Sequence, residues 1–126
     1  MVSDELRVMV LDHMEKGYLE NIIDMLRHDG SLYPLVIDMM RDERMRVRLG
    51  ATALVEEMVR NDPAPFIRLI PSIAGLLQDA NPVVRGDAAN LLEIIGHTDA
   101  LPFLRKALDD KDQHVREIVE EAVRNI

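Results

Sequence analysis

The sequence predicts an all-α solenoid of stacked helical hairpins, because it contains an internal repeat and helix-start signals that lie in register within that repeat. Three windows align without a gap when they are anchored on a Val-Arg pair, at Val47-Arg48, Val84-Arg85 and Val115-Arg116. In every window a proline and an aspartate precede the valine at fixed distances; these residues are Pro34, Pro71 and Pro102, then Asp42, Asp79 and Asp110. Self-similarity at a period of about 20 to 50 residues is typical of solenoids, whose repeats pack only against their neighbours.

Each window predicts two helices joined by a short turn. Apolar residues recur four, seven and eight positions after the valine, as in Ala51, Leu54 and Val55 of the first window. This spacing places them on one stripe of a helix. Asn81, followed by Pro82, and Asp112 are residue types that start helices, and Gly96 is a residue type that ends one.

The interval between the first and second windows holds six more residues than the next interval; these residues are 63–68, which precede Pro71. A proline in a helix interior removes a hydrogen bond and distorts the backbone. The insertion therefore either lengthens the first helix of this repeat, with a kink at Pro71, or forms a separate helical turn.

The N-terminal part has helical patterns over residues 3–16 and 18–28 but lacks the Asp and Val-Arg signature. A terminal unit of a solenoid has one neighbour instead of two and differs in sequence from the internal units. We interpret residues 1–30 as a degenerate capping hairpin, followed by repeats at 31–61, 62–97 and 98–126. The expected whole is a single domain over residues 1–126 with about eight helices in four hairpins.

The segment 95–104, followed by residues 107–110 and 114–116, resembles the HEAT-like repeat of the type found in phycobilisome lyases. The copy at 70–89 fits the same pattern, while the copy at 34–48 departs from it because Arg44 stands where the others have Asn81 or Asp112. The resemblance extends over residues 31–126. It implies a right-handed superhelix in which the second helix of each repeat lines the concave face.

Within that resemblance, the recurrent aspartates and arginines are predicted to form a structural ladder along the stack. Charge-assisted hydrogen bonds would fix the turns and the register of the repeats. The residues of this ladder are Asp42, Arg48, Asp79, Arg85, Asp110 and Arg116. A row of arginines that binds an anionic ligand is the less favoured alternative.

Composition and charge argue against several classes of function. The formal net charge is −8, with only three lysines, which disfavours binding to nucleic acid. A basic cluster at Arg41, Arg44, Arg46 and Arg48 is interleaved with acidic residues, and we favour a solvated turn over a phosphate site. The absence of Cys removes disulfides and thiolate metal sites. Acidic residues near the start, and the lack of a long apolar run, predict neither a signal peptide nor a membrane span, so we expect a cytoplasmic protein.

The sequence also lacks the residues that enzymes of similar repeat architecture require. HEAT-like metal enzymes of the deoxyhypusine hydroxylase type use His-Glu pairs, and none of the four histidines is followed by Glu. Asp110, Asp112 and His114 are considered as metal ligands, but helix capping accounts for Asp112. Aromatic residues make up only 3% of the chain, which argues against a bilin pocket. We therefore expect no enzyme activity, no metal and no cofactor.

The predicted function is a non-enzymatic scaffold that binds a basic or amphipathic helical segment of a protein partner. The proposed concave face contains small, apolar and acidic residues; they are Leu49, Thr52, Ala53, Glu56, Gly86, Ala89, Asn90, Glu93, Glu117, Glu120 and Glu121. An alternative is an accessory subunit, or a lyase-like or chaperone factor, of an enzyme system. Val8 and Leu11 on the N-terminal helix also predict a weak homodimer.

Overall fold

The computed structural model describes residues 2–126, which form eight α-helices, three short 3-10 helices and no strand. The helices are α1 (Asp4–Glu15), α2 (Leu19–His28), η1 (Gly30–Leu32), α3 (Leu35–Arg41), α4 (Met45–Val59), α5 (Ala64–Gly75), η2 (Leu76–Gln78), α6 (Pro82–Ile95), η3 (Thr98–Ala100), α7 (Leu101–Lys106) and α8 (Gln113–Asn125). The predicted all-α class and number of helices are confirmed. Met1, the first residue of the predicted capping hairpin, lies outside the described residues.

The chain divides into two compact units, residues 1–65 and 66–126. This division does not test the prediction of one repeat array over residues 1–126, because the repeats of a solenoid contact only their neighbours.

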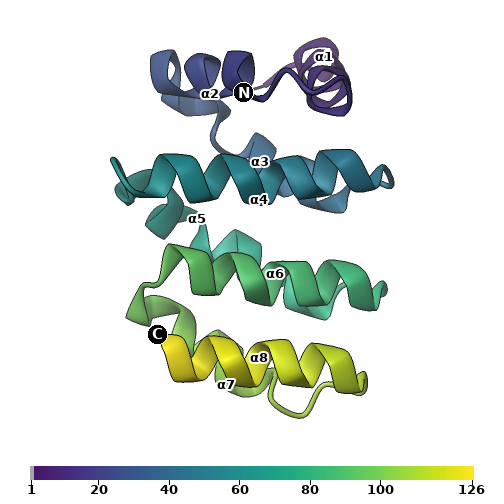
Figure 1. The fold of residues 1–126 in the computed structure, drawn as a ribbon, viewed down its shortest axis with the longest axis vertical. Helices are drawn as coiled ribbons and strands as arrows, with labels where there is room; N and C mark the ends of the chain where they lie inside the picture. Colours follow the sequence, from purple (N-terminus) through teal and green to yellow (C-terminus); the bar gives the residue numbers. More distant parts are fainter. Residues whose placement is uncertain (1) are drawn as a thin grey trace. The chain divides into compact units, whose positions relative to one another are not determined.

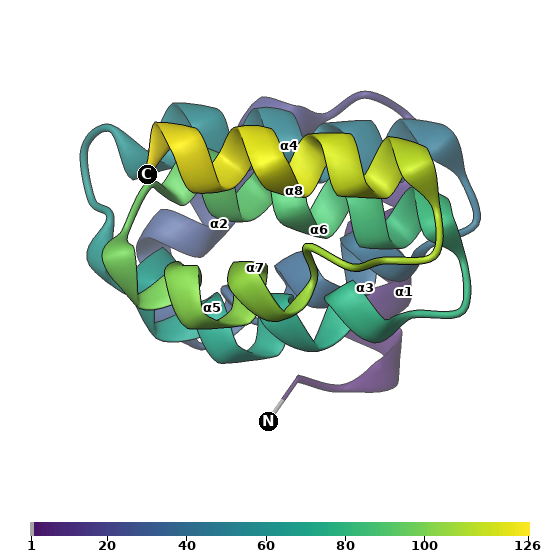
Figure 2. The ribbon, with the colours of Figure 1, turned by 90° about the horizontal axis from the view of Figure 1, so that it is seen from below.

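The first unit contains α1 to α4, and its core is aliphatic. Both α1 and α2 pack against α4, and α3 packs antiparallel to α4 as the first helix of a repeat. The fully buried side chains include Val10 of α1, Ile22 of α2, Met39 of α3 and Leu54 of α4. In Figures 1 and 2, α1 runs across the direction of α2 and α4. The two N-terminal helices thus cross instead of forming a regular antiparallel hairpin.

The second unit contains two helical hairpins side by side, α5 with α6 and α7 with α8. Within it, α6 and α8 form one layer, and α5 and α7 form the other (Figure 2). The contact between α6 and α8 is the most extensive of any pair of helices. Leu91 and Leu92 of α6, Leu104 of α7 and Val119 of α8 are fully buried in this core.

The six-residue insertion lengthens α5, which runs without interruption from Ala64 to Gly75 with Pro71 inside it. The alternative of a separate helical turn is therefore wrong. Pro71 has no N–H to donate to the carbonyl of Ile67, and its ring lies on the exposed side of the helix.

The helix ends in the second unit follow the local signals. The side chain of Asn81 accepts a hydrogen bond from the N–H of Val83 at the start of α6, and that of Asp112 accepts one from Val115 at the start of α8. Gly96 ends α6 with a φ of 70°, a left-handed conformation that favours glycine. None of the helices within residues 2–126 is both long enough and apolar enough to cross a membrane.

Candidate functional site

The three turns that carry the repeat signature, residues 42–48, 79–85 and 110–116, have the same pattern of hydrogen bonds. In each turn the aspartate carboxylate accepts a bond of 2.9 Å from the backbone N–H two residues later. The arginine six residues after the aspartate donates from Nη1 to the aspartate's own carbonyl oxygen; these bonds measure 2.8 Å for Arg48, 2.8 Å for Arg85 and 2.6 Å for Arg116. The fixed spacing of Asp and Arg thus closes a turn between two helices.

A second contact of Arg85 links one repeat to the next. Its Nε and Nη2 atoms donate to the two carboxylate oxygens of Asp110, at 2.9 and 3.1 Å. Both side chains are almost fully buried, with 5% and 8% of their surface exposed. Burial alone would raise the pKa of Asp110, but the hydrogen bonds from Arg85 and from the N–H of Asp112 outweigh it and hold that pKa below its ordinary value.

In the first signature turn, the cation that binds the aspartate carboxylate comes from a different position in the sequence. The carboxylate of Asp42 is held by Arg44 through Nε at 2.9 Å and Nη2 at 3.0 Å. Arg44 also donates from Nη1 to Asp12 of α1 at 2.8 Å. The hydrogen bond from Arg44 lowers the pKa of Asp42, and Asp42 and Asp12 together raise the pKa of Arg44. The departure of Arg44 from the repeat pattern therefore joins α1 to the turn before α4.

The basic cluster at the start of α4 is only partly solvated. Arg44 and Arg48 are half-buried and hydrogen-bonded, whereas Arg41 and Arg46 are exposed. Sequence reasoning treated Arg44 as part of a solvated turn and missed its ion pairs. No signal in the repeat pattern indicates the pair with Asp12, because Asp12 lies 32 residues away.

The predicted partner-binding face is exposed at most of its positions. Leu49, Ala53, Glu56, Asn90, Glu117, Glu120 and Glu121 are exposed, and Thr52 and Glu93 are half-buried. Glu93 accepts a hydrogen bond of 2.8 Å from the side chain of Asn125. The acidic side chains of α8 are thus open to solvent.

Gly86 and Ala89 require a correction, since both are buried. A Cβ atom placed on Gly86 would lie 3.0 Å from Cδ1 of Ile118 in α8. The lack of a side chain at Gly86 lets α6 and α8 approach closely. This packing buries Gly86, although the helical pattern placed it outside the buried stripe of α6. These two residues belong to the packed interior and not to an open binding surface.

The exposed face of α4 is more apolar than predicted. Met45 and Leu49, one helical turn apart, are 63% and 61% exposed. Sequence reasoning missed Met45, although its spacing of four residues from Leu49 is a signal for a shared face. On the N-terminal helix, Val8 is 57% exposed while Leu11 is half-buried, so the predicted apolar patch there is small.

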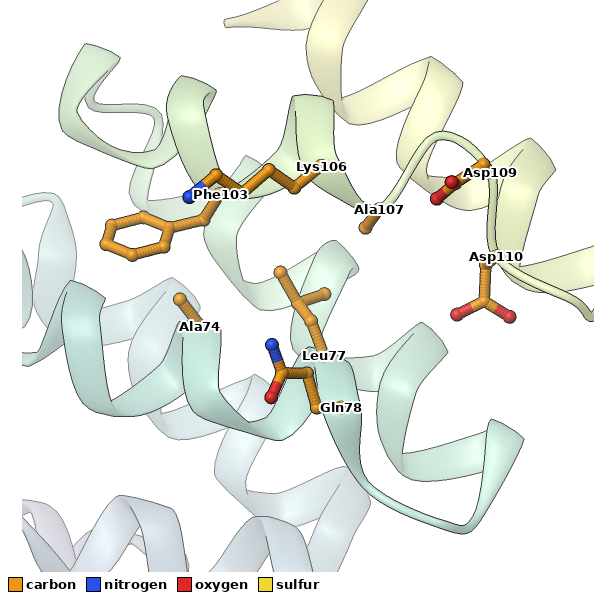
Figure 3. Close-up of a pocket in the computed structure, with 8 residues that line it drawn as sticks. All are labelled: Ala74, Leu77, Gln78, Phe103, Lys106, Ala107, Asp109 and Asp110. Atoms are coloured by element: carbon orange, nitrogen blue, oxygen red, sulfur yellow. The ribbon is translucent and has the colours of Figure 1, made fainter.

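Two shallow depressions lie on either side of Phe103 in the second unit. One, of about 280 Å³, is lined by apolar groups such as Ala74 and Leu77 and by the side chains of Lys106 and Asp109. Figure 3 shows Phe103 and Lys106 at one end of it and the two aspartates at the other. The second depression, of about 520 Å³, lies between α5 and α7 near Pro71. The carboxylate of Asp110 at the edge of the first depression is already bound by Arg85.

The considered metal ligands are not grouped into a site. Asp110 and Asp112 accept hydrogen bonds from backbone N–H groups in the turn that begins α8. Across residues 2–126, no three His, Asp or Glu side chains come close enough together to hold a metal ion.

A family model described as HEAT repeats matches residues 34–124, which include all three signature turns. A search of curated proteins finds no match for the chain.

Proposed function

Because the chain belongs to the HEAT repeat family, we propose that it is a non-enzymatic module that binds a basic or amphipathic helical segment of a protein partner. Stacked helical repeats commonly offer extended surfaces for protein binding. The proposed surface is the exposed face of α4 in the first unit. The exposed acidic face of α8, in the second unit, is considered as a separate surface.

The observation that carries the proposal is the exposure of Met45 and Leu49 on α4. The fold leaves these two large apolar side chains uncovered, one turn apart, beside the small side chain of Ala53. Contiguous exposed apolar groups are typical of surfaces that bind another protein. An amphipathic helix with apolar residues at a spacing of three or four fits such a face.

The charge of the surface determines the chemistry of the partner. On α4 the charge is the exposed carboxylate of Glu56 near the end of the helix. In the second unit, the exposed face of α8 separately carries Glu117, Glu120 and Glu121. Positively charged groups on the partner would approach these carboxylates favourably, and the attraction would weaken with added salt. The net charge of −8 acts in the same direction and disfavours an acidic partner such as nucleic acid.

The proposal is tested with a fluorescein-labelled amphipathic helical peptide of Leu and Lys, titrated with the full chain in an anisotropy assay. We expect binding that weakens with salt, that falls about tenfold or more for Leu49→Asp, and that falls several-fold for Glu56→Lys on the same helix. Glu20→Lys, an exposed charge change on α2, is the matched control and should bind like the wild type.

Equal affinities for the face variants and for the control would contradict the proposed surface. Because all the changed side chains are exposed, circular dichroism should show that every variant is folded. The same variants can then be compared as baits in affinity purification from the native cell, where a true partner is lost only with the face variants.

The alternative function, an accessory or lyase-like factor, is supported only by the resemblance of residues 31–126 to phycobilisome lyase-type repeats. It predicts a chromophore or a metal that copurifies with the protein. An absorbance spectrum and an elemental analysis of the purified chain distinguish the two. We also propose that the superhelix is right-handed and that the protein is located in the cytoplasm.

A further inference from the structure

The exposed face of α4 is complementary to itself in charge and in apolar character. Along the helix, the cation of Arg46 comes first, Leu49 and Ala53 follow, and the carboxylate of Glu56 comes near the end. All four side chains are exposed. Their positions in the helix place them within about a third of its circumference, so they share one face.

We propose that this face binds a second copy of the chain, with the two α4 helices antiparallel about a twofold axis. When the axis passes at the level of Ala51, Arg46 of each copy lies opposite Glu56 of the other. The same arrangement places Leu49 of each copy opposite Ala53 of the other. A large side chain then meets a small one, as helix packing requires, and each face is self-complementary, as an isologous interface requires.

The charges on this face are available for such a contact. Among the described residues, no hydrogen bond or ion pair involves the side chain of Arg46 or of Glu56. Arg46 lies at the edge of the face, with Nη2 3.0 Å from the place that a Cβ on Gly17 would occupy. The proposed contact with Glu56 of the second copy requires this exposed guanidinium to turn from Gly17 toward the face.

The size of the face determines the strength of the association. Helix α4 has 15 residues and is therefore about 22 Å long. One face of such a helix is smaller than the roughly 800 Å² per partner of a standard interface. The dimer is accordingly weak, and its detection needs protein concentrations up to about 1 mM.

The dimer covers Leu49, which the proposed function assigns to the partner. If that function holds, a second copy and the partner helix compete for α4, so self-association keeps the apolar face covered until a partner displaces it. The dimer itself does not depend on the proposed function, because it is measured with no partner present.

Sedimentation equilibrium of the full chain over a concentration series tests the inference. We expect Leu49→Asp to weaken the dimer at least tenfold, and Arg46→Glu and Glu56→Arg each to raise its dissociation constant about threefold to tenfold. The double variant with Arg46→Glu and Glu56→Arg should recover most of the wild-type association, because the two charges are exchanged. Val8→Asp and Glu20→Arg are matched controls on α1 and α2 and should leave the dimer unchanged.

Three results would each overturn the inference. The first is a wild-type chain that stays monomeric at every concentration. The second is a dimer that survives Leu49→Asp but is lost in Val8→Asp, which would assign self-association to the N-terminal helix. The third is a double charge exchange that is no better than the two single variants. Thermal melting of each variant keeps these results separate from unfolding, since the changed side chains are exposed.

Discussion

At the residue scale, Arg44 is the most informative departure from the repeat pattern. The equivalent position in the other signature turns holds Asn81 or Asp112, whose side chains cap the next helix. Arg44 gives α4 no side-chain cap. Instead it supplies the cation for Asp42, a role that Arg85 of the preceding repeat performs for Asp110 in the second unit. The N-terminal helices carry no signature arginine, and Arg44 compensates for that lack.

The first prediction concerns Arg44→Asn, which introduces the residue found at the equivalent position of the next repeat. The new side chain can cap α4, but the carboxylate of Asp42, only 12% exposed, loses its cation, and Asp12 loses its partner. We expect a small net loss in the free energy of unfolding, because part of the ion pair is open to solvent and screened by it. Urea denaturation measures it, with the exposed Arg41→Asn as control. A more stable Arg44→Asn variant would show that capping outweighs the ion pairs.

The second prediction concerns the buried pair of Arg85 and Asp110. Replacing Arg85 by Met leaves a buried carboxylate without a cation, which costs about 3 kcal/mol or more. Arg116→Met is the matched control, since Arg116 donates to the carbonyl oxygen of Asp110 and not to its carboxylate. Guanidinium denaturation should show a clearly smaller loss for Arg116→Met, and equal losses would contradict the role given to Asp110.

The same pair makes stability depend on pH. The pKa of Asp110 in the folded chain lies below its ordinary value of 3.8, so the contribution of the pair is fully present above about pH 4 to 5 and fades as the pH falls through the folded-state pKa. The difference in unfolding free energy between the wild type and Arg85→Met should therefore shrink at low pH. Denaturation curves between pH 7 and pH 3, with Asp110→Asn as reference, measure this difference.

At the scale of the elements, the close packing of α6 on α8 depends on the absence of a side chain at Gly86. The equivalent position in α4 is Leu49, which is exposed. We predict that Gly86→Leu destabilises the chain by about 1 to 3 kcal/mol through overpacking against Ile118. The added change Ile118→Ala should restore part of the loss in thermal denaturation. Leu49→Ala, the control, should cost little, and a well-tolerated Gly86→Leu would contradict close packing here.

The elements differ in how far the sequence alone predicts them. The ends of α6 and α8 follow from Asn81, Asp112 and Gly96, because capping depends on residues within one helical turn. The burial of Gly86 does not follow, because a helical pattern assigns a face to each position but not the distance to the neighbouring helix. The crossing of α1 over α2 is also set by packing between distant side chains, and the sequence of neither helix indicates it.

At the scale of the whole molecule, the charge is spread over both units. Residues 1–65 contain 13 acidic and 8 basic residues, and residues 66–126 contain 10 and 7, so the units carry formal charges of −5 and −3. Like charge on both units favours solubility and opposes close association of copies at low salt. A dimer through α4 must therefore use local attraction between Arg46 and Glu56 against this general repulsion. Added salt screens the repulsion between the negatively charged copies, but it also weakens the two pairs between Arg46 and Glu56. Salt should therefore strengthen the dimer less than screening of the net charge alone would.

The candidate surface was predictable only in part at this scale. The exposed positions of α4 and α8 follow from the buried stripe of each helix, since residues on the opposite side of a stripe face solvent. Met45 could have been included from its spacing to Leu49, but the depressions beside Phe103 do not follow, because they depend on how neighbouring helices pack. The ion pair between Asp12 and Arg44 was missed because the two residues lie 32 positions apart in the sequence.

Each signature turn is completed by seven consecutive residues, from the aspartate to the arginine. Because each turn is closed by its own residues, a repeat can be duplicated, deleted or lengthened on the N-terminal side of the turn. None of these changes removes the hydrogen bonds of the turn. The insertion at residues 63–68 is an example, since α5 has grown while the turn at Asp79 keeps the same bonds. The architecture thus allows the length of a first helix to vary from repeat to repeat, while the second helices keep a common starting geometry.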